Sequence, residues 1–380
     1  NTAKDLGGAV PVTLAGGELR INQGAGSGAT DVSIATLQGT GGAIDTTGTT
    51  VTIGKVTGAG SLQKKGSGTL VLTGLTNDYK GDTTISEGKI QIKSEQGLGD
   101  ANTGSLILDG GSLQVLEVRK PDGTLETIAL GKDAVITSNN GTIDNVANDV
   151  TLSGTVSGAG QLVKSGAGKF VLANDKNTFE GGVRIKEGTL EVGSDGALGK
   201  ENTQVLIDGA TLAITKDAEL KRQIVLTEKG GTVSVAGGSS ATLSGELALD
   251  DNVLSADLTK AGAGTLNLTR DNTQGDFQGN TIIKEGTLGI TSQNNLAEGK
   301  LFLDGGDLRT NASLSFDKEI IVNSTGGIDT ALDALGNKTE VTVSSKIQGN
   351  GGFVKSGEGT LTLLADNAYA GGTQVKGGTL

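Results

Sequence analysis

The chain of 380 residues contains 65 glycines but only 2 prolines, 2 tyrosines and 6 phenylalanines, and it lacks cysteine, histidine, methionine and tryptophan. The missing histidine and cysteine exclude imidazole bases, thiol nucleophiles, disulfides and the usual zinc sites. A formal net charge of −12, without a basic cluster that contains aromatics, argues against a nucleic-acid partner.

Membrane and leader segments are not evident in the sequence. No stretch approaches the roughly 18 consecutive apolar residues of a membrane helix, and no basic-then-apolar segment opens the chain. Leu, Ile and Val recur in short alternating runs, which disfavours glycine-rich disorder. We therefore expect an ordered chain, with any signal or membrane anchor outside the given sequence.

Two glycine-marked phrases recur along the chain. The first appears as LAGGEL, LDGGSL, IDGATL and LDGGDL, at 14–19, 108–113, 207–212 and 303–308. The second appears as GGAID, NGTID, GGTVS and GGIDT, at 41–45, 140–144, 230–234 and 326–330. Short alternating runs bounded by Gly, Asn and Asp predict strands and turns rather than helices.

A longer phrase starts at residue 58, as GAGSLQKKGSGTLVLTGLTNDYKGDTTISEGKI, and returns three times. It contains a lysine at one fixed position: Lys64, Lys164, Lys260 and Lys355. A glycine follows two residues later: Gly66, Gly166, Gly262 and Gly357. An aromatic residue comes next: Tyr79, Phe179, Phe277 and Tyr369. Because only eight aromatics occur in the chain, four at one repeat position indicate a structural requirement.

The spacing inside the long phrase measures one coil of a solenoid. Leu62 recurs as Ile85, 23 residues later, and the other three copies give 23, 25 and 22. Coils of this length with short strands and tight corners are typical of a parallel β-helix. The sequence therefore predicts an all-β fold, an elongated right-handed parallel β-helix (solenoid) with three short strands per rung. A closed antiparallel barrel would need regular hairpin turns, but Asn-Gly occurs only at 140–141 and 350–351.

The repeats also predict the domain organisation. We expect one β-helical domain over residues 1–380, built of about four units of roughly 100 residues. The predicted units are 1–97 (partial), 98–197, 198–293 and 294–380 (partial).

The long phrase, GxGxLxKxGxGTLxLxxxNxYxGxTxIxxGTLxV in outline, resembles the passenger-associated transport repeat of bacterial type V autotransporters. The copy at 158–192 is closest to that pattern, and the resemblance extends over all four copies. It implies that the chain is an excerpt of a β-helical passenger, at the bacterial cell surface or secreted, whose parent chain carries a C-terminal outer-membrane β-barrel. It also implies repeats that assist folding and export, and an adhesin or interaction scaffold that binds a host-cell-surface or extracellular-matrix component.

Three alternatives remain open beside an adhesin. The chain could self-associate, or serve as the carrier stalk of an enzyme or toxin elsewhere in the parent chain. A glycan-cleaving site would need paired carboxylates, for which Asp250 with Asp251, or Asp304 with Asp307, are candidates. Other copies of the Asp304 phrase lose one partner, which indicates turn residues. We expect no enzymatic activity, no cofactor and no metal, since the glycine phrases lack the nonapeptide spacing of calcium repeats.

The repeated lysines and aromatics also have expected places. Copies about 100 residues apart lie four or five coils apart, too far to form a basic patch, so we expect the lysines to be solvated turn residues. The aromatics are expected to pack over glycine-rich turns.

Insertions between the repeats are the candidate binding loops, since loops on a rigid scaffold carry specificity. The step from Leu113 to Ile143 takes 30 residues, against 21 and 20 in the next two units. The extra residues predict a hairpin in VLEVRKPDGTLETI with a turn at Pro121-Asp122-Gly123. Arg119, Lys120 and Asp122 are its candidate partner-binding residues, and a tolerated surface hairpin is the alternative. A smaller insertion, TQGD, lengthens the corner at 273–276.

Overall fold

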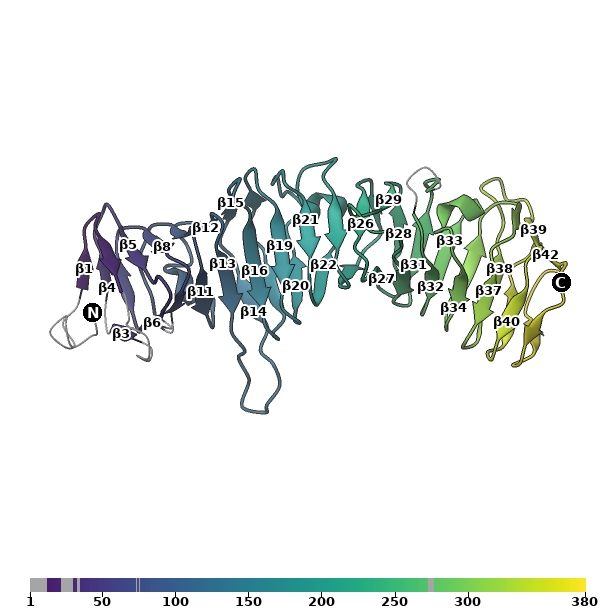
Figure 1. The fold of residues 1–380 in the computed structure, drawn as a ribbon, viewed down its shortest axis with the longest axis horizontal. Coiled ribbons are helices and arrows are strands. Elements are labelled where there is room, and N and C mark those ends of the chain that lie inside the picture. The colour runs from purple at the N-terminus through teal and green to yellow at the C-terminus, as the bar shows by residue number, and fades with distance from the viewer. Residues whose placement is uncertain (1–11, 22–29, 33–34, 73, 75, 273–276) are drawn as a thin grey trace. The chain divides into compact units, whose positions relative to one another are not determined.

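A computed structural model describes residues 12–21, 30–32, 35–72, 74, 76–272 and 277–380. The chain forms two compact units, one of Asn1–Leu190 with Gly196–Thr203 and one of Glu191–Asp195 with Gln204–Leu380. Within each unit, short strands pair in parallel with strands of the next coil (Figure 1). The helical segments of the described residues are 3₁₀ turns such as η1 (Glu95–Leu98), η2 (Asp195–Leu198) and η4 (Gln293–Asn295). None of them could span a membrane.

The first unit has three stacks of strands, one for each side of its coils. Stack A contains β2 (Glu18–Arg20), β5 (Gly42–Asp45), β8 (Leu62–Lys65), β10 (Thr83–Ile85), β12 (Leu106–Leu108), β15 (Ala134–Ile136) and β18 (Val156–Ser157). Stack B contains β3 (Thr30–Val32), β6 (Thr50–Ile53), β9 (Thr69–Leu72), β11 (Lys89–Ile92), β13 (Ser112–Val115), β16 (Gly141–Asn145), β19 (Leu162–Ser165) and β21 (Val183–Ile185). Stack C contains β1 (Val12–Leu14), β4 (Ala35–Leu37), β7 (Val56–Gly58), and then β14 (Ile128–Leu130), β17 (Val150–Leu152) and β20 (Lys169–Leu172).

The second unit also has three stacks. Stack D contains β23 (Val205–Ile207), β26 (Ile224–Leu226), β29 (Leu247–Leu249), and then β36 (Leu314–Phe316), β39 (Glu340–Val343) and β42 (Thr360–Leu363). Stack E contains β24 (Thr211–Ile214), β27 (Gly231–Val235), β30 (Leu258–Ala261), β32 (Thr281–Ile283), β34 (Leu301–Leu303), β37 (Ile320–Val322), β40 (Ile347–Gly349) and β43 (Ala368–Tyr369). Stack F contains β25 (Ala218–Leu220), β28 (Ser240–Leu243), β31 (Thr265–Leu268), β33 (Thr287–Ile290), β35 (Asp307–Thr310), β38 (Gly326–Thr330), β41 (Phe353–Ser356) and β44 (Thr373–Val375). One further strand, β22 (Thr189–Val192), has residues in both units.

The core of each unit is a set of aliphatic columns. In the first unit Ile90 of β11 pairs with Leu70 of the preceding coil and Leu113 of the following coil. All three side chains are buried, and the residues between them in each strand face outward. Equivalent inward positions therefore stack at the strand spacing of about 4.8 Å. This confirms the all-β parallel solenoid predicted from the period-two pattern.

Successive copies of the long phrase lie on successive sides of the solenoid. In the first unit β8, the first strand of copy 1, belongs to stack A, where β10, β12, β15 and β18 follow it. The next strand along the chain, β19, opens copy 2 in stack B. In the second unit β30 opens copy 3 in stack E, followed by β32, β34, β37 and β40, and β41 opens copy 4 in stack F. Within each unit one repeat therefore spans four full coils and one further side. Equivalent residues of successive repeats thus lie on neighbouring sides of the solenoid, about a third of a coil apart.

Candidate functional site

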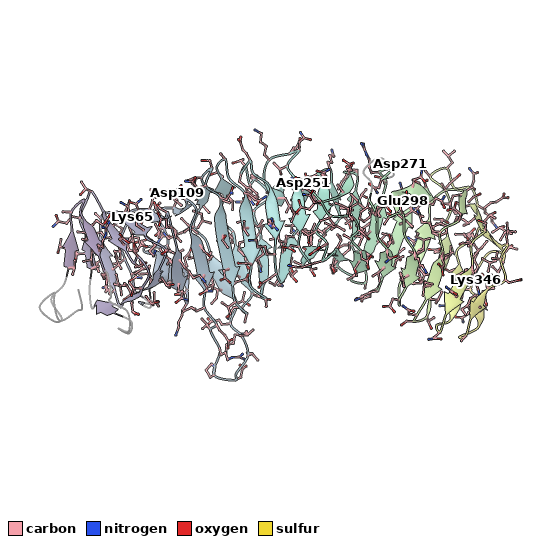
Figure 2. The ribbon with its side chains drawn as sticks, viewed as in Figure 1. Lys65, Asp109, Asp251, Asp271, Glu298 and Lys346 are labelled. Atoms are coloured by element: carbon pink, nitrogen blue, oxygen red, sulfur yellow. The ribbon has the colours of Figure 1, made fainter. Side chains whose placement is uncertain are left out.

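The four repeated lysines are interior residues, and the prediction that they are solvated turn residues is wrong. Their side chains are fully buried: Lys64, Lys164, Lys260 and Lys355. The strand alternation explains this, because the lysine stands two residues after the buried Leu62 and shares its inward direction. The next residue, Lys65, faces outward, and its Nζ atom lies 3.2 Å from Glu18 Oε2 (Figure 2).

Each buried ammonium occupies a cradle of three backbone carbonyls. Lys164 Nζ donates to the carbonyl oxygens of Ser165 at 2.8 Å, Gly166 at 2.6 Å and Glu187 at 3.1 Å. An ammonium has three N–H donors, so the three acceptors match its capacity. The other three lysines make the corresponding three bonds. We call the turns at 64–68, 164–168, 260–264 and 355–359 the lysine corners.

Glycine makes the lysine corners possible. The glycine after each lysine has a positive φ, between 72° and 78°, which other residues adopt only with strain: Gly66, Gly166, Gly262 and Gly357. A Cβ atom on Gly166 would also lie 2.4 Å from the carbonyl oxygen of Asn145 in the preceding coil. The repeated glycine therefore serves both the turn and the close stacking of corners.

Burial lowers the pKa of Lys64, Lys164 and Lys260 to about 8. Neighbouring carboxylates oppose this shift, among them Asp144 and Glu187 at Lys164. At neutral pH each ammonium thus remains protonated and can donate to its three carbonyls. The lysine corners are therefore charge-assisted links within the core.

Three of the repeated aromatics stand on sides of the coil that carry no strand, whereas Tyr369 stands in the short strand β43. Tyr79, Phe179 and Phe277 are buried, and Tyr369 is half-buried. Gly99 lies directly under the ring of Tyr79, where an added Cβ atom would approach two ring carbons to 3.0 Å. Gly199 lies in the same way under Phe179. The rings of Tyr79, Phe179 and Phe277 thus fill the interior where the strand is missing.

A buried asparagine replaces the backbone ladder on these strandless sides. Asn77 Oδ1 accepts from the N–H of Val56 in the preceding coil, and its Nδ2 donates to Gly97 in the next coil. Asn177 and Asn272 make the same pair of links. Asn367 accepts from Ile347 in the same way. We did not predict this role, although the recurring Asn before the aromatic was its signal.

The insertion at 117–126 forms a hairpin between β13 and β14, which projects away from the coils in Figure 1. Its strands are joined by the bonds from Glu126 N to Val118 O at 2.9 Å and from Lys120 N to Thr124 O at 2.8 Å. Asn148, buried in the next coil, holds its base: Oδ1 accepts from Val118 N, and Nδ2 donates to the carbonyls of Val118 and Glu126. The base of the insertion is thus fixed to a buried side chain of the next coil.

The three candidate binding residues lie at the outer part of this hairpin and are all exposed. Arg119 donates to Glu117 Oε1 at 2.5 Å and to the carbonyl of Gly123 at 2.7 Å. Asp122 Oδ1 accepts from the Thr124 hydroxyl at 2.6 Å and from its N–H at 2.9 Å, and these bonds lower the pKa of Asp122. The partner-binding role of Arg119, Lys120 and Asp122 stays a prediction.

Two further exposed segments were missed. A second hairpin lies between β38 and β39, where Leu332 faces Lys338 and Asp333 Oδ1 fixes the turn by accepting from Leu335 N and Asn337 N. A loop at 250–256 follows β29. Leu335 and Leu254 are each 87% exposed in these segments. The sequence distance from the apolar residue of the GGAID-like phrase to the next repeated lysine would have indicated both segments. It is 20 and 21 residues in the first two copies but 27 in each of the last two.

The carboxylate candidates lie in two different places: Asp250 and Asp251 in the loop after β29, and Asp304 and Asp307 at the turn between β34 and β35. Burial raises the pKa of Asp307, and Asp329 adds to the shift. Asp304 accepts from the Ser324 hydroxyl at 3.4 Å, and Asp251 lies in the loop after β29 (Figure 2). No three Asp or Glu side chains gather as a metal site would need within the described part of the chain. The insertion at 273–276 lies outside the described residues.

Comparison with known proteins agrees with the repeat. The passenger-associated-transport-repeat family matches residues 62–92, 162–192, 258–290 and 353–380. These matches contain the four lysine corners, the four aromatics and the asparagine that precedes each aromatic.

Three curated proteins are similar to parts of the chain. The "Adhesin BmaC autotransporter" of Brucella suis biovar 1 (strain 1330) is 40% identical over 169 residues, which cover 43% of this chain and 4% of that protein. The "Uncharacterized lipoprotein YdeK" of Escherichia coli (strain K12) is 27% identical over 60% of this chain and 20% of that protein. The "Probable autotransporter YfaL" of the same strain is 25% identical over 86% of this chain and 30% of that protein.

The chain thus spans less than a third of the length of each of these relatives. No solved structure matches it. The four repeat matches, the autotransporter relatives and the parallel solenoid identify the chain as a passenger segment of an autotransporter, built on passenger-associated transport repeats and placed at the cell surface or secreted.

Proposed function

We propose that this segment is a non-enzymatic interaction scaffold of the adhesin type, and that the hairpin at 117–126 is its contact region. The observation that carries the proposal is the hairpin itself: residues 119–127 are all exposed, while Asn148 ties the base to the solenoid. A rigid base keeps the contact residues in one place and lowers the entropy lost on binding. The relative named as an adhesin supports this class of function.

We also propose that the lysine corners serve folding and export of the passenger. Each lysine joins a corner to the following coil, and each buried asparagine joins a strandless side to the coils before and after it. Such links favour one register of stacked coils over slipped ones. A repeat that fixes the register once every four coils would help a chain that emerges unfolded to stack correctly.

Capture of cells by the purified segment tests the adhesive role. Beads coated with the segment are mixed with host cells, at low and at physiological salt, and bound beads are counted. In one variant residues 117–126 are replaced by Thr-Lys-Asp, the short link that joins β24 and β25 at 215–217. As a matched control, the second hairpin is shortened at 332–338.

Saturable capture that is lost only when 117–126 is replaced would support the proposal. Capture that survives this replacement would move the contact region elsewhere on the solenoid. A segment that captures neither cells nor other beads would overturn the adhesive role and leave a carrier stalk for another part of the parent chain.

A further inference from the structure

The hairpin at 117–126 has two backbone edges that differ in character. Arg119 and Leu125 face each other between the two hydrogen bonds that join the strands. In an antiparallel pair, residues between such bonds direct their own N–H and C=O groups away from the partner strand. The backbone groups of Arg119 therefore line one outer edge, and those of Leu125 line the other.

The edge at 117–121 is protected against pairing. The Arg119 side chain donates to Glu117 and to the carbonyl of Gly123, so a charged guanidinium is held beside this strand. Lys120 follows, and Pro121 has no N–H to donate. Charged side chains, lysine above all, and proline are the usual means by which proteins block exposed strand edges.

The edge at 124–127 is open. It reads Thr-Leu-Glu-Thr, with one charge, no proline and a β-branched residue at each end. All four residues are exposed, and the Leu125 side chain is 37% exposed. Within the described residues the N–H and C=O groups of Leu125 have no partner. Such an edge is a template for another strand.

We propose that the edge at 124–127 pairs with the same edge of a second copy of this chain, antiparallel and about a twofold axis at Leu125. This inference rests on the proposed role of the hairpin as the contact region. In this register Leu125 faces Leu125 of the second copy, and Thr124 faces Glu126. Each Glu126 thus avoids the other, and the two leucines cover each other.

The self-complementary sequence is what favours a second copy over an unrelated partner. A twofold interface requires one patch to fit itself, and the Thr-Leu-Glu-Thr edge does so without opposing like charges. The same operation on the other edge would place Arg119 against Arg119, which is unfavourable. One such contact contains few hydrogen bonds and is weak by itself, so it acts through many copies side by side on a cell surface.

Single cysteines test the register directly, because the chain contains none. In the proposed pair the two Leu125 Cα atoms would be about 5.5 Å apart, within the range of about 4.4–6.8 Å that a disulfide spans. Leu125→Cys should therefore form a covalent dimer under mild oxidation at least about tenfold faster than Arg119→Cys. The second variant is a matched control, since it places an exposed thiol on the opposite strand of the same hairpin.

A non-covalent measurement complements the cross-link. Beads coated with the segment should clump, and Leu125→Pro should abolish clumping because it removes the N–H that crosses the twofold axis. Arg119→Pro is the control, since that N–H also points outward but on the protected edge. Hydrogen exchange of Glu126 N–H checks that the hairpin is intact in both variants.

Equal cross-linking at the two positions, or clumping that survives Leu125→Pro, would overturn the inference. Capture of host cells that depends on 117–126 but is indifferent to Leu125→Pro would retain the proposed function and reject the strand pairing. Preferential cross-linking at Leu125 without any capture of host cells would place the function in association between like cells.

Discussion

The Nζ atom of Lys164 lies 3.1 Å from the carbonyl oxygen of Glu187, which belongs to the following coil. The same inter-coil contact joins Lys64 to Glu87 at 3.2 Å and Lys260 to Glu285 at 2.9 Å. A charged side chain in the interior therefore adds a further link between two corners that the backbone also joins, as in the bond from Lys186 N to the carbonyl of Lys164 at 2.9 Å.

Replacing Lys164 with methionine should destabilise the segment. Methionine fills a similar volume but donates no hydrogen bond, so three carbonyls lose their donor. An unsatisfied buried acceptor costs about 1–3 kcal/mol, and removal of a buried charge offsets part of that cost. We expect the free energy of unfolding in urea to fall by about 2–4 kcal/mol. Lys186→Met, at an exposed position one coil on, is the control and should change it little.

The buried lysines also predict a dependence of stability on pH. Their pKa values of about 8 lie below the 10.5 of an ordinary lysine. Between pH 8 and 10 the unfolded chain therefore binds more protons than the folded chain, and stability rises with pH. The rise should be about 1–2 kcal/mol per lysine.

Above pH 10 the buried phenol of Tyr79 opposes this rise. Burial raises the pKa of Tyr79, so the unfolded chain releases that proton first and folding loses stability as pH increases further. Urea unfolding at intervals from pH 7 to 10.5 measures the profile, and Lys164→Met should lower its slope between pH 8 and 10. A free energy of unfolding that falls between pH 8 and 10 would contradict the lowered pKa of the buried lysines.

The aromatic positions offer a stabilising substitution. The hydroxyls of Tyr79 and Thr83 lie 2.5 Å apart. Copy 3 has Phe277 opposite Thr281, whose buried Oγ1 has no partner among the described residues. Phe277→Tyr should supply that partner and raise the free energy of unfolding by about 1 kcal/mol.

Copy 2 provides the matched control for this substitution. Val183 stands there in the place of the threonine, so Phe179→Tyr would bury a hydroxyl with no partner and should destabilise. The midpoints of thermal unfolding of both variants measure these opposite effects on stability. Equal shifts of the two midpoints would show that the hydroxyl pair does not control the stability of this corner.

Two glycines with nearly the same positive φ should respond differently to alanine. Gly99 has φ of 84° and Gly123 has φ of 83°. A Cβ atom on Gly99 would lie 2.6 Å from the carbonyl oxygen of Tyr79, whereas on Gly123 it would meet nothing. We expect Gly99→Ala to cost about 2–4 kcal/mol, and Gly123→Ala about 1 kcal/mol. Chemical denaturation of both variants measures the difference, and similar losses would contradict the close packing under the ring.

The base of the hairpin should depend on Asn148. Asn148→Ala removes three hydrogen bonds to Val118 and Glu126, so amide exchange in 117–126 should become faster by more than tenfold. The adjacent strands β13 and β16 should keep most of their protection. Asn139→Ala, at an exposed asparagine that bonds Asp109, is the control and should leave the hairpin unchanged.

Much of the fold could be predicted because every coil repeats the same sequence periodicity. Alternation of apolar and polar residues placed the strands, and repeated intervals of 22–25 residues gave the coil length. The inward direction of the Lys64 side chain was harder to predict than the strands. The same alternation places it inward, but the cost of burying an ammonium argued for solvent. Only the stacked corner shows the three carbonyls that make an interior lysine acceptable.

The candidate site divides in a similar way. The insertion at 117–126 was visible as a count of residues, and its turn was visible as Pro-Asp-Gly. Its anchor was not, because Asn148 lies 30 residues from Val118 and meets it only when one coil stacks on the next. Which backbone groups of the hairpin point outward at each edge also depends on which groups pair across the turn.

By itself the sequence determined the class of fold, the length of a coil and the residues that repeat, since these follow from local periodicity and from the conformations open to glycine. The tertiary structure decided what those residues contact. A repeat of four coils plus one side puts equivalent positions on different faces, and the partners of each lysine and asparagine come from neighbouring coils. Such contacts join residues 20 or more positions apart, and no local pattern specifies them.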